Sequence, residues 1–426
     1  MNSYEINPPR LSWRMLCRRP SSGNTQVKQR VEEIITLVRQ KGDAALRSLS
    51  QEIDGRPLKE IALSDAAIRE AALAVSPEVK AAIADAARNI RAFHQAQKPQ
   101  EIRVETAPGV TCIQRPVPIE RIGLYIPGGS APLFSTVLML AIPARIAGCP
   151  EVVLCTPTRK DGTVSPEVLY AASYCGIRQV FGIGGAQAIA AMAYGTETVP
   201  QVDKIFGPGN QYVTCAKQML AGEIVAIDMP AGPSEVMVMA DASTPAAIAA
   251  ADLLSQAEHG PDSQVMLVAD KRETCNVILE EVERQAALLP RCDIARKALE
   301  KSRAFVFDKL ADRIDFANTY APEHLIIATE DPWKIADKIT AAGSVFVGLY
   351  TPESAGDYAS GTNHTLPTSG WARSFSGVNL DSYYRKMTLQ EITRDGLKGL
   401  RDTIVSMATA EGLDAHANAV KVRTDE

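Results

Sequence analysis

The chain has 426 residues, of which 46% are apolar and 22% are charged, and its formal net charge is −5 with neutral histidines. This composition excludes an intrinsically disordered chain, because the apolar fraction is ordinary for a globular protein and the net charge is small for the length. It also argues against nucleic-acid binding, which requires a concentrated excess of Lys and Arg. At roughly 150 residues per domain, the length predicts two or three domains. We expect a small-molecule partner.

Cysteine usage and apolar runs predict a cytoplasmic protein without membrane contact. The eight cysteines lack Cys-x-x-Cys spacing, which favours reduced, partly buried thiols. The first twenty residues contain four arginines and no apolar stretch of signal-peptide length, so we expect no export signal. The apolar run 137–142 is followed by Pro143 and Arg145, and it is far shorter than the roughly 20 residues that span a bilayer.

The N-terminal part of the chain is predicted to be helical from about Asn24 to Phe93. Apolar residues recur there at helical spacing in two stripes, one around Val31 and one around Ile83. The second stripe begins at Ser76 and Pro77, a hydroxyl cap followed by proline at the first helical position. We therefore expect amphipathic helices before the first strand.

Short apolar runs alternate with capped helical segments after Arg121, which is typical of parallel sheets covered by helices. The predicted strands of a first group are 123–126, 152–155, 180–183, 204–206 and 224–227. Those of a second group are 236–239, 265–268, 305–307, 325–327 and 345–347. The sequence thus predicts two α/β units, with ligands at the carboxyl ends of the strands in the crevice between them.

The C-terminal segment beyond about Gly377 is predicted to be helical. Thr388 and Glu391 have the spacing of a capping box, and an apolar stripe follows from Leu397 to Ala408. Glu411 continues this stripe, so we expect it to face protein and to need a partner. The segment is too short to bury a core alone and must pack on something else.

Four polar residues suggest a metal site, although spacing alone does not establish one. Gln256 and His259 are three residues apart near the end of a predicted helix, so they share one face. Asp357 and His416 could complete a mixed nitrogen and oxygen site for zinc. The alternatives are a polar helix end for Gln256 and His259 and an ordered loop around Asp357.

An acid and an imidazole, Glu323 and His324, lie at the start of a predicted strand. At this junction both could reach one cleft as general acid and base groups, but a capping pair on a surface loop explains them equally well. Three glycine-rich turns, 125–130, 182–187 and 206–210, follow strands. Their context suits phosphate binding at helix starts, although none has the G-x-G-x-x-G spacing and each could be a simple tight turn.

Long segments of the chain resemble the histidinol dehydrogenase family, the NAD-dependent zinc enzymes of histidine biosynthesis. The matching segments are Tyr125-Ile-Pro-Gly-Gly-Ser-Ala-Pro-Leu, Ile205-Phe-Gly-Pro-Gly-Asn, Asp228-Met-Pro-Ala-Gly-Pro-Ser-Glu, Leu254-Ser-Gln-Ala-Glu-His-Gly-Pro-Asp-Ser-Gln, Pro322-Glu-His-Leu and Glu353-Ser-Ala-Gly-Asp-Tyr-Ala-Ser-Gly-Thr-Asn-His. The resemblance covers nearly the whole chain, and runs of this length are highly specific.

The resemblance implies a role for each candidate residue. One zinc ion per subunit would be held by Gln256, His259, Asp357 and His416. His324 would be the general base, and Glu323 would activate water. Substrate would contact the four zinc ligands together with Ser234, His324, His364 and Glu411. NAD would contact Tyr125, Gln187 and Asn210.

The resemblance also implies a fold and an assembly. We expect an α/β protein with two incomplete Rossmann-like parallel-sheet units, a helical N-terminal region and a helical C-terminal tail, in an intertwined homodimer with shared active sites. The expected parts are an N-terminal segment (1–22), a zinc and catalytic domain (23–123 plus 236–377), an NAD domain (124–235) and a tail that reaches the partner subunit (378–426).

The implied activity is two successive NAD-dependent oxidations, from L-histidinol through L-histidinal to L-histidine. Three alternatives remain. A dehydrogenase of a related amino or sulfonated alcohol could use the same NAD unit. A zinc-dependent hydrolase could use the same acid, imidazole and metal without NAD. A non-catalytic metabolite-binding protein is disfavoured, because every proposed catalytic position is filled.

Overall fold

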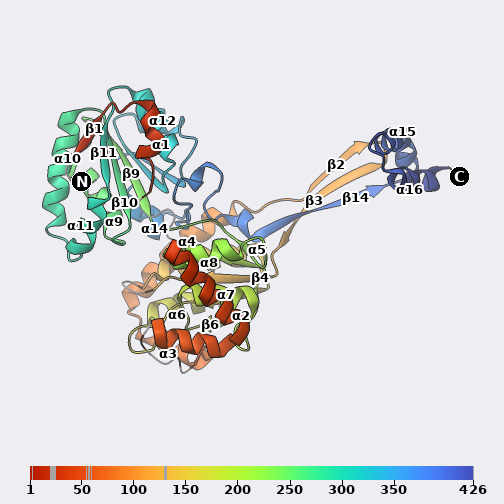
Figure 1. The fold of residues 1–426 in the computed structure, drawn as a ribbon, viewed down its shortest axis with the longest axis horizontal. Helices are drawn as coiled ribbons and strands as arrows, with labels where there is room; N and C mark the ends of the chain where they lie inside the picture. The colour runs from red at the N-terminus through yellow and green to blue at the C-terminus, as the bar shows by residue number, and fades with distance from the viewer. Residues whose placement is uncertain are drawn as a thin grey trace.

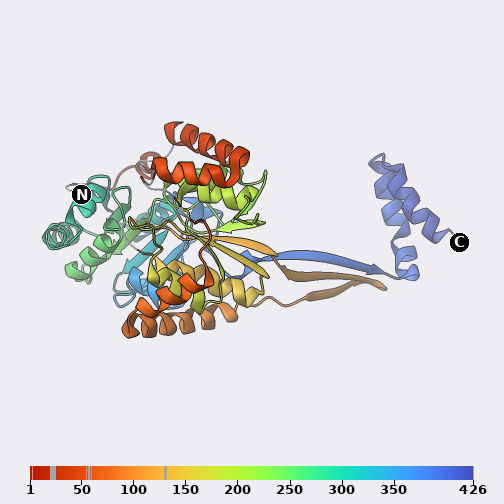
Figure 2. The ribbon, with the colours of Figure 1, turned by 90° about the horizontal axis from the view of Figure 1, so that it is seen from below.

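The structure is a computed structural model that describes residues 1, 3–19, 25–53, 55, 58, 60–128 and 132–425. It is a mixed α/β protein with two parallel sheets, and each sheet is covered by helices (Figure 1). A three-stranded antiparallel ribbon extends from this body and has a helical pair at its far end (Figure 2). None of the described helices has the length and apolarity needed to cross a membrane.

The first sheet has the strand order β1-β11-β10-β9-β12-β13, and all neighbouring strands are parallel. Its strands are β1 (Tyr4–Ile6), β9 (Glu235–Ala240), β10 (Gln264–Ala269), β11 (Arg303–Val306), β12 (His324–Ala328) and β13 (Ser344–Val347). Every residue of β9, β10 and β12 is buried. This burial explains why these strands are continuous apolar runs in the sequence.

Helices cover both faces of the first sheet. One face packs against α9 (Ala246–Ala257), α10 (Arg272–Ala286) and α11 (Cys292–Glu300). The other packs against α1 (Trp13–Leu16), α12 (Leu310–Tyr320) and α13 (Pro332–Ala336). The short 3₁₀ helix η1 (Arg10–Ser12) precedes α1. The N-terminal segment is therefore part of this unit, because β1 pairs with β11 and Trp13 packs edge-on against Phe307 and Phe316.

The second sheet has the strand order β6-β5-β4-β7-β8 and is also parallel. Its strands are β4 (Arg121–Tyr125), β5 (Glu151–Cys155), β6 (Gln179–Phe181), β7 (Lys204–Phe206) and β8 (Ala226–Ile227). Its helices are α2 (Thr25–Ile53), α3 (Asp65–Ala74), α4 (Pro77–Gln95), α5 (Phe134–Ala147), α6 (Pro166–Tyr174), α7 (Gly185–Tyr194) and α8 (Gln211–Leu220). All strands expected from apolar runs are present in the two sheets. Most of their ends differ from the expected ones by one or two residues.

The N-terminal helices pack in a different unit from the one that the sequence analysis assigned to them. The sequence analysis grouped 23–123 with 236–377, but α2 packs against α7 and α8, α3 against α6, and α4 against α5, all in the second unit. The physical reason is that the predicted stripe around Val31 completes the core beneath α7, while Ile83 and Ile90 join the core around α5. Residues 20–24 lie outside the described part of the chain, as do residues 129–131 of the first glycine-rich turn.

The ribbon is the main element that the sequence analysis missed. It pairs β2 (Ile102–Ala107) and β14 (Tyr384–Ile392) with the two edges of β3 (Val110–Pro118). Thr388 and Glu391 lie within β14, so the expected capping box there is wrong. The next helix, α15 (Arg394–Ala410), is capped by Thr393, whose hydroxyl accepts a hydrogen bond from the Gly396 N–H at 3.1 Å.

The tail consists of α15 and α16 (Asp414–Thr424), which pack on each other at the end of the ribbon, away from the body (Figures 1 and 2). Three short helices lie between β13 and β14: α14 (Glu353–Tyr358), η2 (Trp371–Arg373) and η3 (Leu380–Tyr383). The prediction of a helical tail is thus confirmed only after residue 393, because the chain first forms a strand.

Candidate functional site

The candidate catalytic residues lie at the amino ends of strands in the first sheet. His324 is the first residue of β12, and Glu235 is the first residue of β9, the neighbouring strand. The expectation that ligand-binding residues follow the carboxyl ends of strands is therefore wrong for this sheet. In the second sheet, two cofactor candidates do lie at carboxyl ends, since Tyr125 ends β4 and Asn210 follows β7.

Glu323 and His324 are both buried, with 6% and 4% of their surface exposed. The His324 Nδ1–H donates a hydrogen bond to the Glu235 carbonyl at 3.1 Å, and Glu323 Oε2 accepts one from the Glu235 N–H at 2.8 Å. Glu323 Oε2 is 3.6 Å from His324 Nδ1. These contacts exclude the alternative of a capping pair on a surface loop.

The surroundings of His324 leave one of its ring nitrogens ready to accept a proton. A carbonyl oxygen can only accept, so Nδ1 carries the hydrogen, and in a neutral imidazole the lone pair is then on Nε2. Nε2 has no hydrogen-bond partner and lies 3.8 Å from Asp357 Oδ1. Burial lowers the pKa of His324 to about 4. The ring is therefore neutral at pH 7, as a general base requires.

Burial shifts the pKa of Glu323 in the opposite direction. Loss of hydration raises its pKa well above the ordinary value, and the hydrogen bond from the Glu235 N–H opposes this effect. The charge of Glu235 contributes a further increase. A raised pKa makes the carboxylate form of Glu323 a stronger proton acceptor than an ordinary carboxylate.

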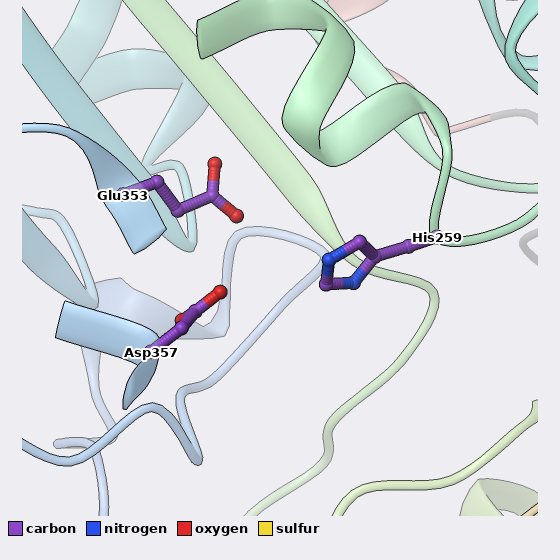
Figure 3. A group of neighbouring side chains, drawn as sticks. All are labelled: His259, Glu353 and Asp357. Atoms are coloured by element: carbon purple, nitrogen blue, oxygen red, sulfur yellow. The ribbon is translucent and has the colours of Figure 1, made fainter. Parts of the chain in front are cut away.

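A cluster of potential metal ligands lies beside His324. One ligand atom from each of His259, Glu353 and Asp357 falls within 4.8 Å of the others, and the three side chains face a common space (Figure 3). Glu353 and Asp357 are four residues apart on α14 and so share a face. His259 follows the end of α9, and Gln256 lies in its last turn.

Gln256 and Glu353 are buried, and their side chains lack hydrogen-bond partners. Gln256 is 0% exposed and Glu353 is 1% exposed, yet both amide atoms of Gln256 and both carboxylate oxygens of Glu353 lack a hydrogen-bond partner. Buried polar groups are normally satisfied, so this arrangement indicates a site built for a ligand. Burial, together with the charge of Asp357, raises the pKa of Glu353 well above its ordinary value.

The donor set fits a zinc ion. Imidazole nitrogen, carboxylate oxygen and amide oxygen are suitable ligands for this borderline cation. Burial also lowers the pKa of His259, which favours the neutral ring that binds metal. Of the four expected ligands, the structure brings His259 and Asp357 together, and it adds Glu353, which the sequence analysis did not assign. Gln256 lies in the last turn of α9, three residues before His259, with its buried amide unpartnered.

His364 and Ser234 connect this cluster to the second unit. The His364 Nδ1–H donates to the Asp357 main-chain carbonyl at 2.9 Å, and Nε2 is 3.1 Å from the Thr136 hydroxyl on α5. Ser234 lines a cavity of about 340 Å³ together with His259 and Asn210. One cavity thus joins an expected metal ligand, a substrate-contacting candidate and a cofactor-contacting candidate.

The three cofactor candidates lie at or after the carboxyl ends of strands in the second sheet. The Tyr125 hydroxyl accepts a hydrogen bond from the Gly185 N–H at 3.1 Å, at the start of α7. Gln187, in the first turn of α7, has a buried Oε1 without a partner. Asn210 Oδ1 caps α8 by accepting from the N–H groups of Tyr212 and Val213 at 3.0 and 3.1 Å. Tyr125 and Gln187 lie at the start of α7 and Asn210 at the start of α8, and helix starts of this kind suit the diphosphate of a dinucleotide.

Glu411 and His416 are not part of this cluster in the single chain. Glu411 follows the last residue of α15, His416 lies in α16, and both are exposed. Figures 1 and 2 place this tail beyond the far end of the ribbon. The expectation that Glu411 faces protein is therefore wrong within one chain.

The sequence analysis missed two residues of the site, Glu353 and Glu235. Glu353 was quoted within a matching segment, and its spacing of four residues from Asp357 could have indicated a shared helical face. Glu235 also closes a matching segment, but its role gave no local signal, because its main-chain contacts to Glu323 and His324 depend on strand pairing and not on its side chain.

Comparisons with known proteins agree with this geometry. The family model described as histidinol dehydrogenase matches residues 17–424. A histidinol dehydrogenase from Bacteroides fragilis is 53% identical over 419 residues, which is 98% of each chain. One from Xanthomonas campestris is 54% identical over 400 residues, covering 94% of this chain and 93% of that protein.

Solved structures give the same result. The crystal structure of histidinol dehydrogenase from Elizabethkingia anophelis has a TM-score of 0.95 at 50% identity and covers 99% of this chain and 98% of its own. A betaine aldehyde dehydrogenase from Staphylococcus aureus, with a TM-score of 0.51 at 12% identity, covers 85% of this chain and 88% of its own and shows likeness of fold alone. The chain belongs to the histidinol dehydrogenase family.

Proposed function

We propose that this protein oxidises L-histidinol to L-histidine in two NAD-dependent steps, through L-histidinal. The observation that carries the proposal is the position of His324. Its unpaired Nε2 lies beside the ligand cluster of His259, Glu353 and Asp357, and the carboxyl group of Glu323 is adjacent. A neutral base, a second proton acceptor and a cation site are the groups that such an oxidation needs.

The zinc ion would be held by Gln256, His259 and Asp357, with the partner subunit's His416 as a further ligand. The unpaired amide of Gln256 and the spacing of the other ligand atoms support this assignment. When bound, zinc would orient the substrate through the imidazole and amine nitrogens of histidinol. Ser234, which lines the cavity beside His259, and His364, which contacts the Asp357 main chain, would contact the substrate together with the partner subunit's Glu411.

NAD would contact Tyr125, Gln187 and Asn210. The buried, unpaired Oε1 of Gln187 and the cavity that Asn210 shares with His259 support this position. When bound, NAD supplies the acceptor for the hydride that leaves the substrate carbon. In each sheet the first long strand, β9 or β4, lies inside the strand order, and later strands are added on both sides of it. This arrangement supports the proposal that both units are incomplete Rossmann-like folds.

Proton transfer is the task of the chain's own residues. In the first oxidation His324 Nε2 takes the hydroxyl proton of the alcohol, and the aldehyde forms. As water adds to the aldehyde, the protonated His324 returns its proton to the aldehyde oxygen and Glu323 takes a proton from the water, which gives the hydrate and leaves His324 neutral. His324 takes a hydroxyl proton again in the second oxidation. Its burial, and the hydrogen bond that fixes its tautomer, suit it to both steps.

We further propose a homodimer in which each tail completes the partner's site. Glu411 and His416 are exposed and remote from the other candidates in the single chain. The tail also exposes apolar side chains, with Met407 60%, Leu413 43% and Val422 62% exposed. Such exposure is expected of a segment that packs on another chain. The eight free cysteines suit the reducing cytoplasm, where we place the enzyme.

Metal removal separates this proposal from its alternatives. We expect a chelator, or His259→Ala, to abolish both NADH formation and histidinol consumption, and zinc to restore the chelated enzyme but not the variant. Hydrolytic activity that needs zinc but forms no NADH would instead indicate a zinc hydrolase. NADH formation from other amino or sulfonated alcohols, but not from histidinol, would indicate the related dehydrogenase.

A further inference from the structure

Glu235 contacts both proposed catalytic side chains through its main chain. Its N–H donates to Glu323 Oε2 at 2.8 Å, and its carbonyl accepts from the His324 Nδ1–H at 3.1 Å. The first contact orients the carboxyl group, and the second fixes the tautomer of the imidazole. The position of one peptide segment at the start of β9 therefore sets the geometry of both groups.

The side chain of Glu235 is held by a buried ion pair with Arg19. Arg19 Nε donates to Oε1 at 2.9 Å, and Nη2 donates to Oε2 at 2.7 Å, which is the bidentate arrangement. The Ser369 N–H donates to Oε1 at 2.8 Å. Only 2% of the Glu235 side chain and 9% of the Arg19 side chain are exposed.

Arg19 is itself fixed in place by several contacts. Its guanidinium lies over the ring of Tyr320, 3.7 Å from the centroid, and donates to the main-chain carbonyls of Tyr320 and Cys17 at 2.9 and 3.0 Å. The Tyr320 hydroxyl donates to Gln264 Oε1 at 2.8 Å, at the start of β10. Arg19 thus connects the N-terminal segment to the amino ends of β9 and β10.

We propose that the Arg19–Glu235 pair positions Glu323 and His324 for proton transfer. This proposal rests on the catalytic roles proposed above for those two residues. Neither member of the pair lines the cavity shared by His259, Ser234 and Asn210, so neither is a catalytic residue. A buried ion pair adds little net stability. Its bidentate geometry does, however, hold a peptide segment in a defined position, and displacement of a reacting group by about 1 Å can cost about 100-fold in rate.

The test compares Arg19→Ala with Arg19→Lys in the zinc-loaded, full-length enzyme. We expect kcat for histidinol to fall about 10- to 100-fold in Arg19→Ala, while KM and zinc content stay close to the wild-type values, because the proposed metal and substrate ligands are unchanged. Arg19→Lys keeps the positive charge but loses the bidentate contact, so this variant should have intermediate activity. Arg10→Ala is the matched control, since Arg10 pairs with Asp312 and Asp315 in the same N-terminal segment without touching Glu235.

Chemical rescue adds a readout that a purely structural role would not give. Arg19 lines a cavity of about 750 Å³ together with Arg14, Arg18 and Arg373. Guanidinium ions added at millimolar concentration can enter through it, and we expect them to restore part of the kcat of folded Arg19→Ala. They should have no such effect on Arg10→Ala or on the wild-type enzyme.

Two variants measured in parallel separate the outcomes. If His324→Ala and Glu323→Gln are impaired but folded Arg19→Ala has wild-type kcat, or changes only KM, the positioning proposal is overturned while the catalytic roles stand. If His324→Ala and Glu323→Gln are both fully active, the catalytic roles fail and the positioning proposal fails with them. If Arg19→Ala does not fold, the decision passes to Arg19→Lys: wild-type kcat in that variant overturns the proposal, and reduced kcat with unchanged KM supports it.

Discussion

Gln256 and Glu353 show how individual side chains prepare this site for a ligand. Four of their buried polar atoms have no hydrogen-bond partner. Each unsatisfied buried group costs about 1–3 kcal/mol, which the fold must offset elsewhere and which a bound cation and substrate would recover. The site is therefore organised before its ligands arrive, and His324 is organised with it through the Glu235 carbonyl.

Metal binding should release protons and become tighter as pH rises. Burial, with the charge of Asp357, raises the pKa of Glu353, so its carboxyl group is protonated in the metal-free protein at pH values above its ordinary pKa. A cation in the cluster stabilises the carboxylate and displaces that proton. Higher pH removes the proton in advance, so apparent zinc affinity should increase as pH rises.

Titration calorimetry in two buffers of different ionisation enthalpy measures this release. Glu353→Gln is the matched variant, and it should release fewer protons per zinc than the wild type. An equal proton count in the two proteins, or zinc affinity that does not change with pH, would show that Glu353 does not titrate with the metal.

The neighbouring residues Glu323 and His324 should separate the two oxidations. His324→Ala should slow both, because each removes a hydroxyl proton. Glu323→Gln should slow the aldehyde-to-acid step about 100-fold and leave alcohol oxidation close to normal, since only the second half needs activated water. Single-turnover rates with histidinol and with histidinal measure each half. Equal damage to both halves by Glu323→Gln would contradict the role assigned to that residue.

The strands of the two sheets and those of the ribbon differ in how readily the sequence reveals them. β9, β10 and β12 are buried along their whole length, so a continuous apolar run predicts them. In β14 only Tyr384 and Leu389 are even partly buried. A strand that faces solvent on both sides has no period-two alternation, and its pairing with β3 joins residues far apart in the chain. Local sequence therefore could not reveal it.

The junction between ribbon and tail depends on close packing of two glycines. A Cβ on Gly396, in the first turn of α15, would lie 2.6 Å from the carbonyl oxygen of Gly109 at the turn between β2 and β3. Gly109 has a φ of +75°, which favours glycine. The junction fixes the direction in which α15 leaves the ribbon and therefore the position of Glu411 and His416.

Gly396→Ala should reduce activity by moving the tail, without unfolding the body. Gly399 lies on the same helix with nothing within 4 Å of its would-be Cβ, so Gly399→Ala is the matched control. We expect at least about a tenfold loss of kcat in Gly396→Ala and wild-type activity in Gly399→Ala, which should gain helix stability of about 1 kcal/mol. Thermal unfolding and steady-state rates check both. Equal kinetics in the two variants would mean that the junction does not position the tail.

The whole molecule brings together parts that are far apart in the sequence. The N-terminal segment adds a strand to the first sheet, and the following helices cover the second. Motif resemblance named most of the candidate residues, because they lie in long specific segments. The sequence also placed Glu323 and His324 at the start of a strand, but it could not show that Glu235 begins the neighbouring strand, since strand order follows from how the sheet assembles.

Shared sites can be tested by mixing two inactive chains. His324→Ala and His416→Ala chains are refolded together: if tails are exchanged, one site of the mixed dimer carries both lesions and the other carries none. Random pairing makes half of the dimers mixed, each with one intact site of two, so about one quarter of wild-type activity should return. No activity, with mixed dimers shown to be present, would mean that each tail serves its own chain.

The most direct test of the account is the number of NADH molecules formed per histidinol consumed. The purified, zinc-loaded enzyme is given limiting L-histidinol with excess NAD, and NADH and the organic product are both measured at completion. The account predicts two NADH per histidinol with histidine as the only product, since His324 and Glu323 would serve two oxidations at one site. One NADH per histidinol with histidinal as the final product, or histidinol consumed without NADH, would contradict it.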